Sequence, residues 1–242
     1  MKSSGPSLHV LFAKEALDPA RLRDKVVIAI DILFATSTLA HVLAEGAADV
    51  RLAYGEDDAH QLEVDVEKPL LAGEYNADTI AGFAPATPLA LAEHGVRGRN
   101  LIYASTNGTV ALLRAAPAAH VYAASLLNGA AVARHVGIAH PQASVLLLCA
   151  GSAGRFNLED SYGAGHLAAH LLAHRNYSCT DAAWAALHIR SGHEPLGVLA
   201  GSHIGRMMCA RGLSDEVAFA ARTDTLDVVP VLGERQRIWS VT

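Results

Sequence analysis

The stretch VVIAIDILFATST, residues 26–38, decides the fold. Its first five residues are apolar without polar alternation, a pattern typical of a strand buried on both faces of a sheet. Asp31 follows at once, and Thr36 or Ser37 can cap a helix that Gly46 is placed to end. The stretch therefore predicts a buried strand, a polar turn and a helix, the repeating unit of an α/β protein.

The same unit recurs downstream. The apolar runs LIYA, HVYAA and SVLLLCA each lead into small polar residues, beginning at Ser105, Ser125 and Gly151, and a helical pattern follows each of them. Strand and helix patterns alternate from about residue 26 to residue 174. We therefore predict a three-layer α/β/α fold around a mostly parallel, possibly mixed, central sheet.

The remaining segments are expected to complete one α/β domain over residues 1–242. Helical patterns cover residues 158–174 and 181–190, and the helical segment at about 175–222 is a possible cap on the sheet. DVVPVL (227–232) and RIWSV (237–241) predict two edge strands, because Pro230 has no N–H to donate to a central ladder.

Composition argues against several classes of protein. With 51% hydrophobic and 18% charged residues, the 242-residue chain can build a sizeable core. A net charge of −5 argues against nucleic-acid binding, and no apolar run approaches the roughly 20 residues of a membrane span. The amino-terminal residues lack the apolar core of a secretory signal, and Cys149, Cys179 and Cys209 form no CxxC pair. We therefore expect a cytoplasmic protein, and the Ala-rich helices leave a homo-oligomer open.

The polar clusters after the strands are expected to form one site, because ligands bind at the carboxyl ends of strands in open α/β sheets. Their hydroxyls, amides and carboxylates suit a phosphate group held together with a metal ion. Several carboxylates with few cysteines are the set that suits Mg²⁺. Glu159 and Asp160 also begin a helix, where the helix dipole favours acidic residues without any ligand.

The turn Ser105-Thr106-Asn107-Gly108-Thr109 has two interpretations. As the start of a helix, its free N–H groups and the helix dipole can bind an anion, and Gly108 lets a ligand approach the backbone. It can equally be an ordinary capped turn with Asn107 as the N-cap. The hydroxyl run Thr36-Ser37-Thr38 allows the same two interpretations.

His166, His170 and His174 recur every four residues on one face of a predicted helix. That spacing can bind a transition metal. No Glu is placed as in the H-E-x-x-H motif, so a half-exposed helix face is the favoured interpretation.

Taken together, five segments resemble the 2-phosphosulfolactate phosphatase family in order and spacing: DILFATST (31–38), GEYN (73–76), STNGT (105–109), SLLNGA (125–130) and CAGSAGRFNLED (149–160). The resemblance implies an α/β/α fold, dependence on Mg²⁺ and hydrolysis of the phosphate ester of a small sulfonated hydroxy acid. In that family the reaction belongs to coenzyme M biosynthesis.

The chain departs from the family pattern at two cationic positions. Phe34 and Tyr75 stand where the family usually has arginine, the natural partner of phosphate or sulfonate oxygens. Arg155 could compensate if its loop reaches the site. Two alternatives to the family reaction therefore stay open: a homologue that binds an anionic metabolite without turnover, and a phosphatase with a less anionic or more apolar substrate.

The resulting site hypothesis is a Mg²⁺-dependent phosphatase acting on a small-molecule phosphate ester. Asp31, Glu74 and Asp160 are the expected metal ligands, and Glu159 is a ligand or the base for water. The expected phosphate- and substrate-binding residues are Ser37, Thr38, Asn76, Thr106, Asn107, Gly108, Thr109 and Asn128.

Overall fold

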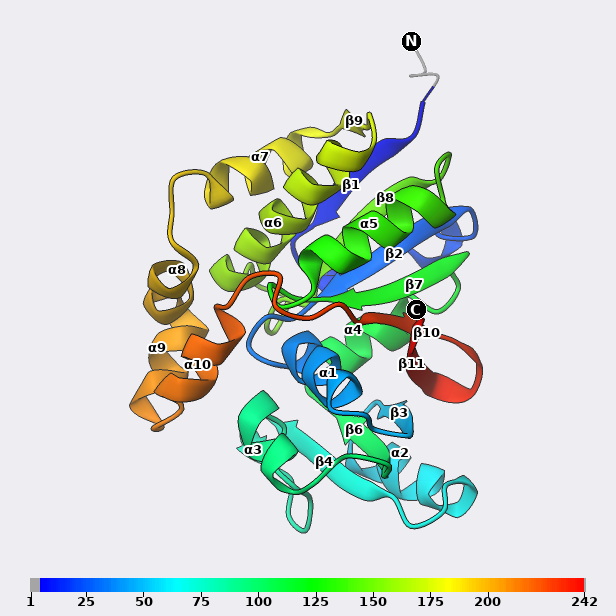
Figure 1. Cartoon of the computed structure of the whole chain (residues 1–242), viewed down its shortest axis with the longest axis vertical. Helices are drawn as coiled ribbons and strands as arrows, with labels where there is room; N and C mark the ends of the chain where they lie inside the picture. The colour runs from blue at the N-terminus through cyan, green and yellow to red at the C-terminus, as the bar shows by residue number, and fades with distance from the viewer. Residues whose placement is uncertain (1–4, 242) are drawn as a thin grey trace.

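The computed structural model describes residues 5–241. One 11-stranded sheet runs through it in the order β5-β4-β6-β3-β11-β10-β7-β2-β8-β1-β9, with helices on both sides (Figure 1). Most neighbouring strands are parallel; the antiparallel pairs are β4–β5, β10–β11, β7–β10 and β3–β11. The structure thus confirms the predicted α/β fold with a mostly parallel, mixed sheet.

The strands are β1 (Ser7–Leu11), β2 (Lys25–Ile30), β3 (Asp49–Ala53), β4 (Leu70–Tyr75), β5 (Asp78–Thr79), β6 (Asn100–Ala104), β7 (His120–Ala124), β8 (Ser144–Cys149), β9 (Ser178–Cys179), β10 (Val229–Leu232) and β11 (Arg237–Val241). The helices are α1 (Ala35–Ala44), α2 (Glu56–Leu62), α3 (Pro88–Glu93), α4 (Gly108–Arg114), α5 (Gly129–Ala139), α6 (Leu158–His174), α7 (Asp181–Arg190), α8 (Pro195–Gly201), α9 (His203–Ala210) and α10 (Ser214–Ala220). None of them, within residues 5–241, has the length and apolar character needed to cross a membrane.

Strand β2 is buried on both faces, as its unbroken apolar run predicts. Val26, Ile28 and Ile30 pack into a core shared with α5 and α6. Val27 and Ala29 point the other way, into a core shared with α1 and α4. Because successive side chains of a strand point to opposite faces, this strand needs apolar residues at every position.

Strands β10 and β11 lie in the middle of the sheet, so the prediction of two edge strands is wrong. They form an antiparallel pair inserted between β7 and β3. Pro230 is tolerated because β7 pairs with β10 only at Val231 and Leu232, beyond the proline. On its other side Pro230 faces Ser240, whose hydroxyl accepts a bond from the Val229 N–H.

Helices α8, α9 and α10 form a group beside the carboxyl ends of the strands (Figure 1). Buried Glu216 on α10 joins this group to α3: its carboxylate accepts hydrogen bonds from the N–H groups of Leu89 and Ala90 and from the Thr87 hydroxyl. An acidic group at the start of a helix also interacts favourably with the helix dipole. The link holds one border of the cavity described next.

Candidate active site

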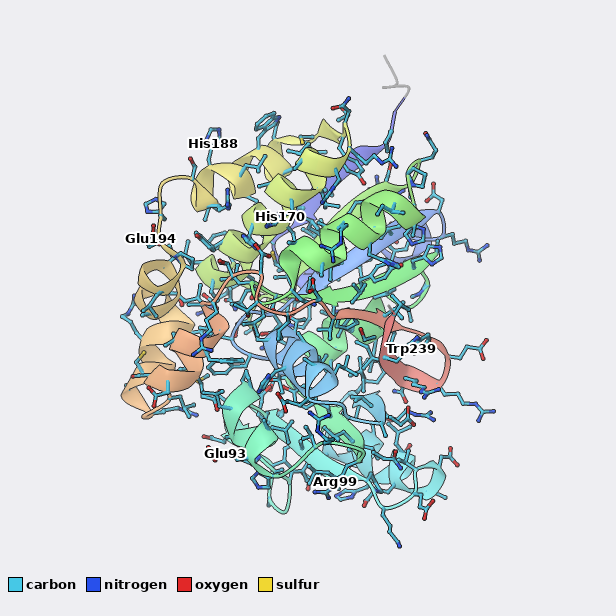
Figure 2. The ribbon with its side chains drawn as sticks, in the orientation of Figure 1. Glu93, Arg99, His170, His188, Glu194 and Trp239 are labelled. Atoms are coloured by element: carbon cyan, nitrogen blue, oxygen red, sulfur yellow. The ribbon has the colours of Figure 1, made fainter. Side chains whose placement is uncertain are left out.

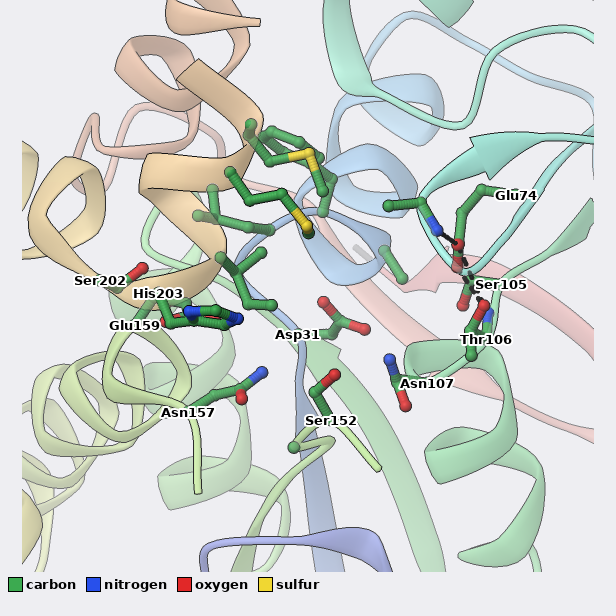
Figure 3. Close-up of a pocket in the computed structure, with 18 of the residues that line it drawn as sticks. Asp31, Glu74, Ser105, Thr106, Asn107, Ser152, Asn157, Glu159, Ser202 and His203 are labelled. Carbon is green, nitrogen blue, oxygen red and sulfur yellow. Dashed lines mark hydrogen bonds between the residues drawn. The ribbon is translucent and has the colours of Figure 1, made fainter. Parts of the chain in front are cut away.

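A cavity of about 1100 Å³ opens where β2, β4, β6 and β8 end. Its lining comes from these four strand ends, from the segment after β1, from the segment that leads into α3, from the loop before α6 and from α9. Figure 3 shows Asp31 near its centre, with Glu74 and Thr106 on one side and Glu159 and His203 on the other. Polar residues that follow β2, β4, β6 and β8 therefore gather at one edge of the sheet, as ligand sites in open α/β sheets do, whereas Ser125 and Asn128, which follow β7, do not line the cavity.

Asp31 is the central carboxylate. It follows β2 directly and is only 9% exposed. Burial, followed by the negative charges of Glu74 and Glu159, raises the pKa of Asp31 to about 7. Within residues 5–241, no Lys, Arg or His side chain forms an ion pair with Asp31. A buried carboxylate of this kind is costly unless something positive binds it.

Gly108 allows α4 to begin against Asp31. A Cβ at this position would lie 2.6 Å from Asp31 Oδ2 and 2.3 Å from the Ala35 Cβ. No side chain fits in that space, so glycine is needed here for the close approach of two elements. Gly108 therefore shapes the site by leaving room for Asp31.

Glu74 is bound to the turn that follows β6. Its Oε1 accepts the Thr106 N–H at 2.5 Å, and its Oε2 accepts the Thr106 hydroxyl at 3.0 Å and the Ala77 N–H at 2.7 Å. The Thr106 hydroxyl oxygen in turn accepts the N–H of Asn76. These bonds fix Glu74 at the cavity wall and join the β4 and β6 ends.

The neighbouring residues Glu159 and Asp160 face different surroundings. Glu159 lines the cavity and is 2% exposed, and burial raises the pKa of its carboxyl. Asp160 points behind the cavity, where its two oxygens accept the N–H groups of Ile32 at 2.9 Å and Gly151 at 3.1 Å. Burial and the charges of Asp31 and Glu159 raise the Asp160 pKa well above its usual value. Asp160 thus holds together the loops after β2 and β8.

Lys14 is a functional candidate that sequence reasoning missed. It is 5% exposed, lines the cavity and donates hydrogen bonds to Asn107 Oδ1 at 2.7 Å and to the Ala150 carbonyl at 3.3 Å. Its position in the sequence could have identified it, because Lys14 directly follows the apolar run LHVLFA (8–13), just as Asp31 follows VVIAI. His203 and Ser152 also line the cavity and were missed. His203 lies on α9, where the sequence shows no motif, and Ser152 lies within the CAGSAGRFNLED segment but was not singled out there.

Of the predicted phosphate- and substrate-binding residues, Asn76, Thr106 and Asn107 line the cavity. Among residues 5–241, the cavity wall does not include the other five: Ser37, Thr38, Gly108, Thr109 and Asn128. The side chains of all of these except Gly108 form hydrogen bonds with backbone groups. The Asn128 amide, for example, accepts the Ser125 N–H and donates to the Val228 carbonyl. Their contact with substrate stays a prediction.

The cavity has an apolar wall and two exposed arginines. Phe34, Ile204, Met207 and Met208 line it, so the residue at position 34 adds apolar surface where the family pattern has a cation. Arg155 and Arg206 also line the cavity, which places Arg155 where compensation for the missing arginines requires it. Tyr75 is 68% exposed.

The predicted metal ligands Asp31, Glu74 and Asp160 do not bring their oxygen atoms close together. In the chain from residue 5 to 241, the one group of three His, Cys, Asp or Glu side chains with donor atoms within 4.8 Å of one another is His166, His170 and Asp224. Asp31, Glu74 and Asp160 form no such group, and their role as ligands stays a prediction. His174, the third histidine of the predicted stripe, lies outside the His166 group.

Comparison with known proteins gives a consistent result over most of the chain. A family model described as 2-phosphosulpholactate phosphatase matches residues 11–235. A protein of Deinococcus radiodurans named "Probable 2-phosphosulfolactate phosphatase" is 38% identical over 210 residues, which cover 86% of this chain and 87% of that protein.

Proteins with the same name from two other bacteria are similar over comparable lengths. The one from Carboxydothermus hydrogenoformans is 31% identical over 223 residues, covering 92% of each chain. The one from Symbiobacterium thermophilum is 35% identical over 221 residues, covering 89% of this chain and 94% of its own.

Proposed function

The chain belongs to the 2-phosphosulpholactate phosphatase family, and from that premise we propose that it is a Mg²⁺-dependent phosphatase. Its substrate would be the phosphate monoester of a small acid, with 2-phosphosulfolactate, which the relatives' names contain, as the first candidate. Coenzyme M biosynthesis, a cytoplasmic location and a homo-oligomeric state stay expectations from the sequence.

The observation that carries the proposal is Asp31. It is a buried carboxylate at a strand end, it lines a large cavity, and no cationic side chain in the described residues contacts it. A divalent cation is the partner that would stabilise such a charge, and the proximity of the negative charges of Glu74 and Glu159 strengthens that attraction.

The oxygen donors around the cavity fit Mg²⁺, which prefers carboxylate ligands. Asp31 would hold the ion, with Glu159 and Glu74 as the flanking acidic groups. Each Asp160 oxygen accepts one backbone N–H bond and keeps a second lone pair that could also bind the ion. When bound, the cation would offset the negative charge that builds on the phosphoryl oxygens during transfer.

The chain's own residues would bind and orient the ester. Lys14 offers the buried positive charge, and the Thr106 and Ser152 hydroxyls and the Asn107 amide line the same cavity. These groups would hold the phosphoryl oxygens as charge develops on them. Glu159, whose carboxyl pKa is raised, would act as the base that accepts a proton from the attacking water as the water oxygen bonds to phosphorus. The departing alcohol oxygen would take a proton from solvent.

The apolar wall favours a second candidate substrate for the same reaction. Phe34, Ile204 and Met208 face the cavity that the acidic residues share. A sulfonate would find no hydrogen-bond donor on these side chains, whereas an apolar group would bury surface against them. We therefore propose a phosphate ester with an apolar substituent as the alternative to 2-phosphosulfolactate.

The test is phosphate release from 2-phosphosulfolactate and from a panel of esters that differ in the apolar group, with Mg²⁺ and with chelator. We expect release that needs Mg²⁺ and that Asp31→Asn abolishes, with Asp24→Asn, an exposed aspartate, as the matched control. No release of phosphate from any ester by folded protein would contradict the proposal and favour a homologue that only binds anions. Unchanged turnover by folded Asp31→Asn protein would contradict the role of Asp31.

A further inference from the structure

Two histidines of α6 and one aspartate from the chain beyond α10 meet outside the cavity. His166 Nε2 lies 3.1 Å from Asp224 Oδ1, and His170 Nε2 lies 3.0 Å from Asp224 Oδ2. The two imidazole rings are 4.6 Å apart and nearly perpendicular. Figure 2 shows His170 on α6.

The local structure holds this group in place. Residues four apart on a helix lie on one face, so α6 presents both rings to the same partner. Asp224 has a φ of 54°, and its N–H donates to the Leu126 carbonyl at 2.8 Å, while its Oδ1 also accepts the Ala130 N–H at 2.8 Å. The carboxylate is therefore oriented by the backbone at the start of α5 and does not depend on the histidines alone.

Gly129 leaves space beside the donor atoms. A Cβ at this position would lie 2.7 Å from His166 Cδ2, 2.9 Å from His166 Nε2 and 3.5 Å from Asp224 Oδ1. A side chain there would close the space next to the nitrogen and oxygen that face each other. The side chains of His170 and Asp224 are 28% and 29% exposed, so solvent reaches the same point.

The donor types suit a transition metal, the three donor atoms lie within 4.8 Å of one another, and each histidine nitrogen is about 3 Å from one Asp224 oxygen. Ligand atoms about 2.1 Å from one ion, with bond angles of about 90° to 109°, lie roughly 3.0–3.4 Å apart. Two imidazoles and one carboxylate suit Zn²⁺, and solvent access leaves a further position for water. We propose that His166, His170 and Asp224 form a binding site for a Zn²⁺-like divalent metal ion, separate from the cavity.

The same contacts set the charge of Asp224 in the metal-free protein. Burial alone would raise its pKa, but hydrogen bonds from His166 and His170 and the charge of His166 hold the pKa well below the usual range. The carboxylate is therefore ionised in the metal-free protein. The His–Asp hydrogen bonds also satisfy these polar groups when no metal is present. Direct measurements of metal binding therefore have to distinguish the hydrogen-bonded, metal-free group from the metal-bound group.

A metal here would join α6 to the connection between α10 and β10. Glu159 at the start of α6 lines the cavity, and α9, which precedes α10, supplies Met207 and Met208 to it. An ion held by His166, His170 and Asp224 would thus tie α6, which borders the cavity, to the segment that follows α10. Its chemistry differs from that of the proposed Mg²⁺ site, which has oxygen donors only.

The test is metal binding by the full chain, freed of any histidine tag and treated with chelator. We expect the protein to bind one equivalent of Zn²⁺ by calorimetry with a micromolar or lower Kd, undiminished by millimolar Mg²⁺, and to raise its Tm when bound. Co²⁺ should give visible absorption bands from nitrogen ligation. His170→Gln and Asp224→Asn should weaken Zn²⁺ binding at least ten-fold, which is about 1.4 kcal/mol.

Three matched variants should bind Zn²⁺ as the unmodified protein does. His174→Gln changes the exposed histidine one turn along α6, and His140→Gln changes a second histidine group, in which His120 and His140 stack at 4.0 Å. Asp31→Asn changes the proposed Mg²⁺ site and leaves this one intact.

Absence of Zn²⁺ binding at micromolar concentration would overturn the proposal. So would His170→Gln or Asp224→Asn protein that binds Zn²⁺ as tightly as the unmodified chain. His170 is partly exposed, and asparagine keeps an oxygen to accept the Ala130 N–H, so both variants should fold. If neither folds, the Co²⁺ spectrum of the unmodified protein decides, because oxygen-only ligation would overturn the site.

Discussion

Lys14 and Asn107 lie at the ends of two different strands of the sheet and are joined by a 2.7 Å hydrogen bond from the Lys14 ammonium to the Asn107 amide oxygen. The amide of Asn107 therefore does not cap α4, although Asn107 occupies the N-cap position. The bond holds a buried positive charge at the wall of a cavity whose other charged groups include Asp31, Glu74 and Glu159.

Replacing Lys14 by methionine should lower kcat/KM for phosphate release by about ten- to a hundred-fold. The change keeps much of the side-chain volume and removes the charge, and hydrogen bonds to charged groups contribute about 1.5–3 kcal/mol. Steady-state kinetics would measure it, with Lys25→Met, which removes a lysine paired with exposed Asp24, as the control. Equal kinetics for Lys14→Met and the unmodified protein would remove Lys14 from the site.

Gly108→Ala should misplace Asp31. The new Cβ would meet Asp31 Oδ2 at 2.6 Å and Ala35 at 2.3 Å, so either α4 or the carboxylate must move. We expect a loss of about 1–3 kcal/mol of stability from overpacking and at least a ten-fold loss of turnover.

Gly197→Ala is the matched control for Gly108→Ala. Gly197 lies in α8 with nothing within 4 Å of its Cβ direction, so alanine there should stabilise the helix by about 0.5–1 kcal/mol. Urea unfolding and the phosphate assay would measure both variants. A Gly108→Ala protein with normal stability and turnover would show that Asp31 does not need this space.

Asp31 should make the metal-free protein less stable as pH rises from about 4 to about 7. Its pKa is about 7 in the folded chain against an ordinary value of 3.8, so in this range the folded state binds more protons than the unfolded state. The free energy of unfolding therefore falls as pH rises toward the folded-state pKa of Asp31. Above that pKa, the folded state bears the full cost of burying an ionised Asp31. The pKa values of Glu159 and Asp160 are also raised beside it, so the transition belongs to the group.

Asp31→Asn protein, without divalent metal, should accordingly be more stable than the unmodified chain at pH 8 and similar to it at pH 4. A Tm gain of several degrees is expected at pH 8, since 1 kcal/mol corresponds to about 2–4 °C for a chain of this size. Millimolar Mg²⁺ should narrow the gap by stabilising only the unmodified protein. A difference in Tm that stays constant from pH 4 to pH 8 would contradict the assigned titration.

Glu216→Gln should loosen the contact between α10 and α3. The carboxylate accepts two N–H bonds and one hydroxyl bond at the start of α3, and glutamine keeps a single oxygen and loses the charge. We expect a loss of about 1–2 kcal/mol and a raised KM, because Thr87 and Ala90 line the cavity. Asp215→Asn, at the exposed neighbouring position, should leave the Tm and KM nearly unchanged.

Local sequence patterns predicted the elements well where one helix or strand contains the whole signal. The helices over residues 158–174 and 181–190 have the predicted bounds, because periodic apolar residues specify them without reference to distant chain. The site was predictable only in part: Asp31, Glu74 and Glu159 line one cavity because the carboxyl ends of strands share one edge of the sheet, but Asp160 and five of the eight predicted binding residues do not line it.

Features that depend on distant partners could not be predicted. Pro230 prevents a central position of β10 only if the pairing with a neighbouring strand requires its N–H. In the observed register, β7 pairs with β10 at Val231 and Leu232, so that N–H is not required. The sequence alone does not reveal this register. Glu159 and Asp160 are adjacent letters that point about 100° apart on a helix, so only the packing of α6 decides which one enters the cavity. Asp224 likewise reaches His166 from 58 residues away.

The central position of β10 and β11 has a consequence for biosynthesis. β7 and β3, which belong to opposite halves of the sheet, are joined through β10 and β11, the last two strands within residues 5–241. A nascent chain whose residues 229–241 are still inside the ribosome would therefore carry two half-sheets with open edges at β7 and β3. At that stage of translation, capture by chaperones and edge-to-edge aggregation compete with completion of the sheet.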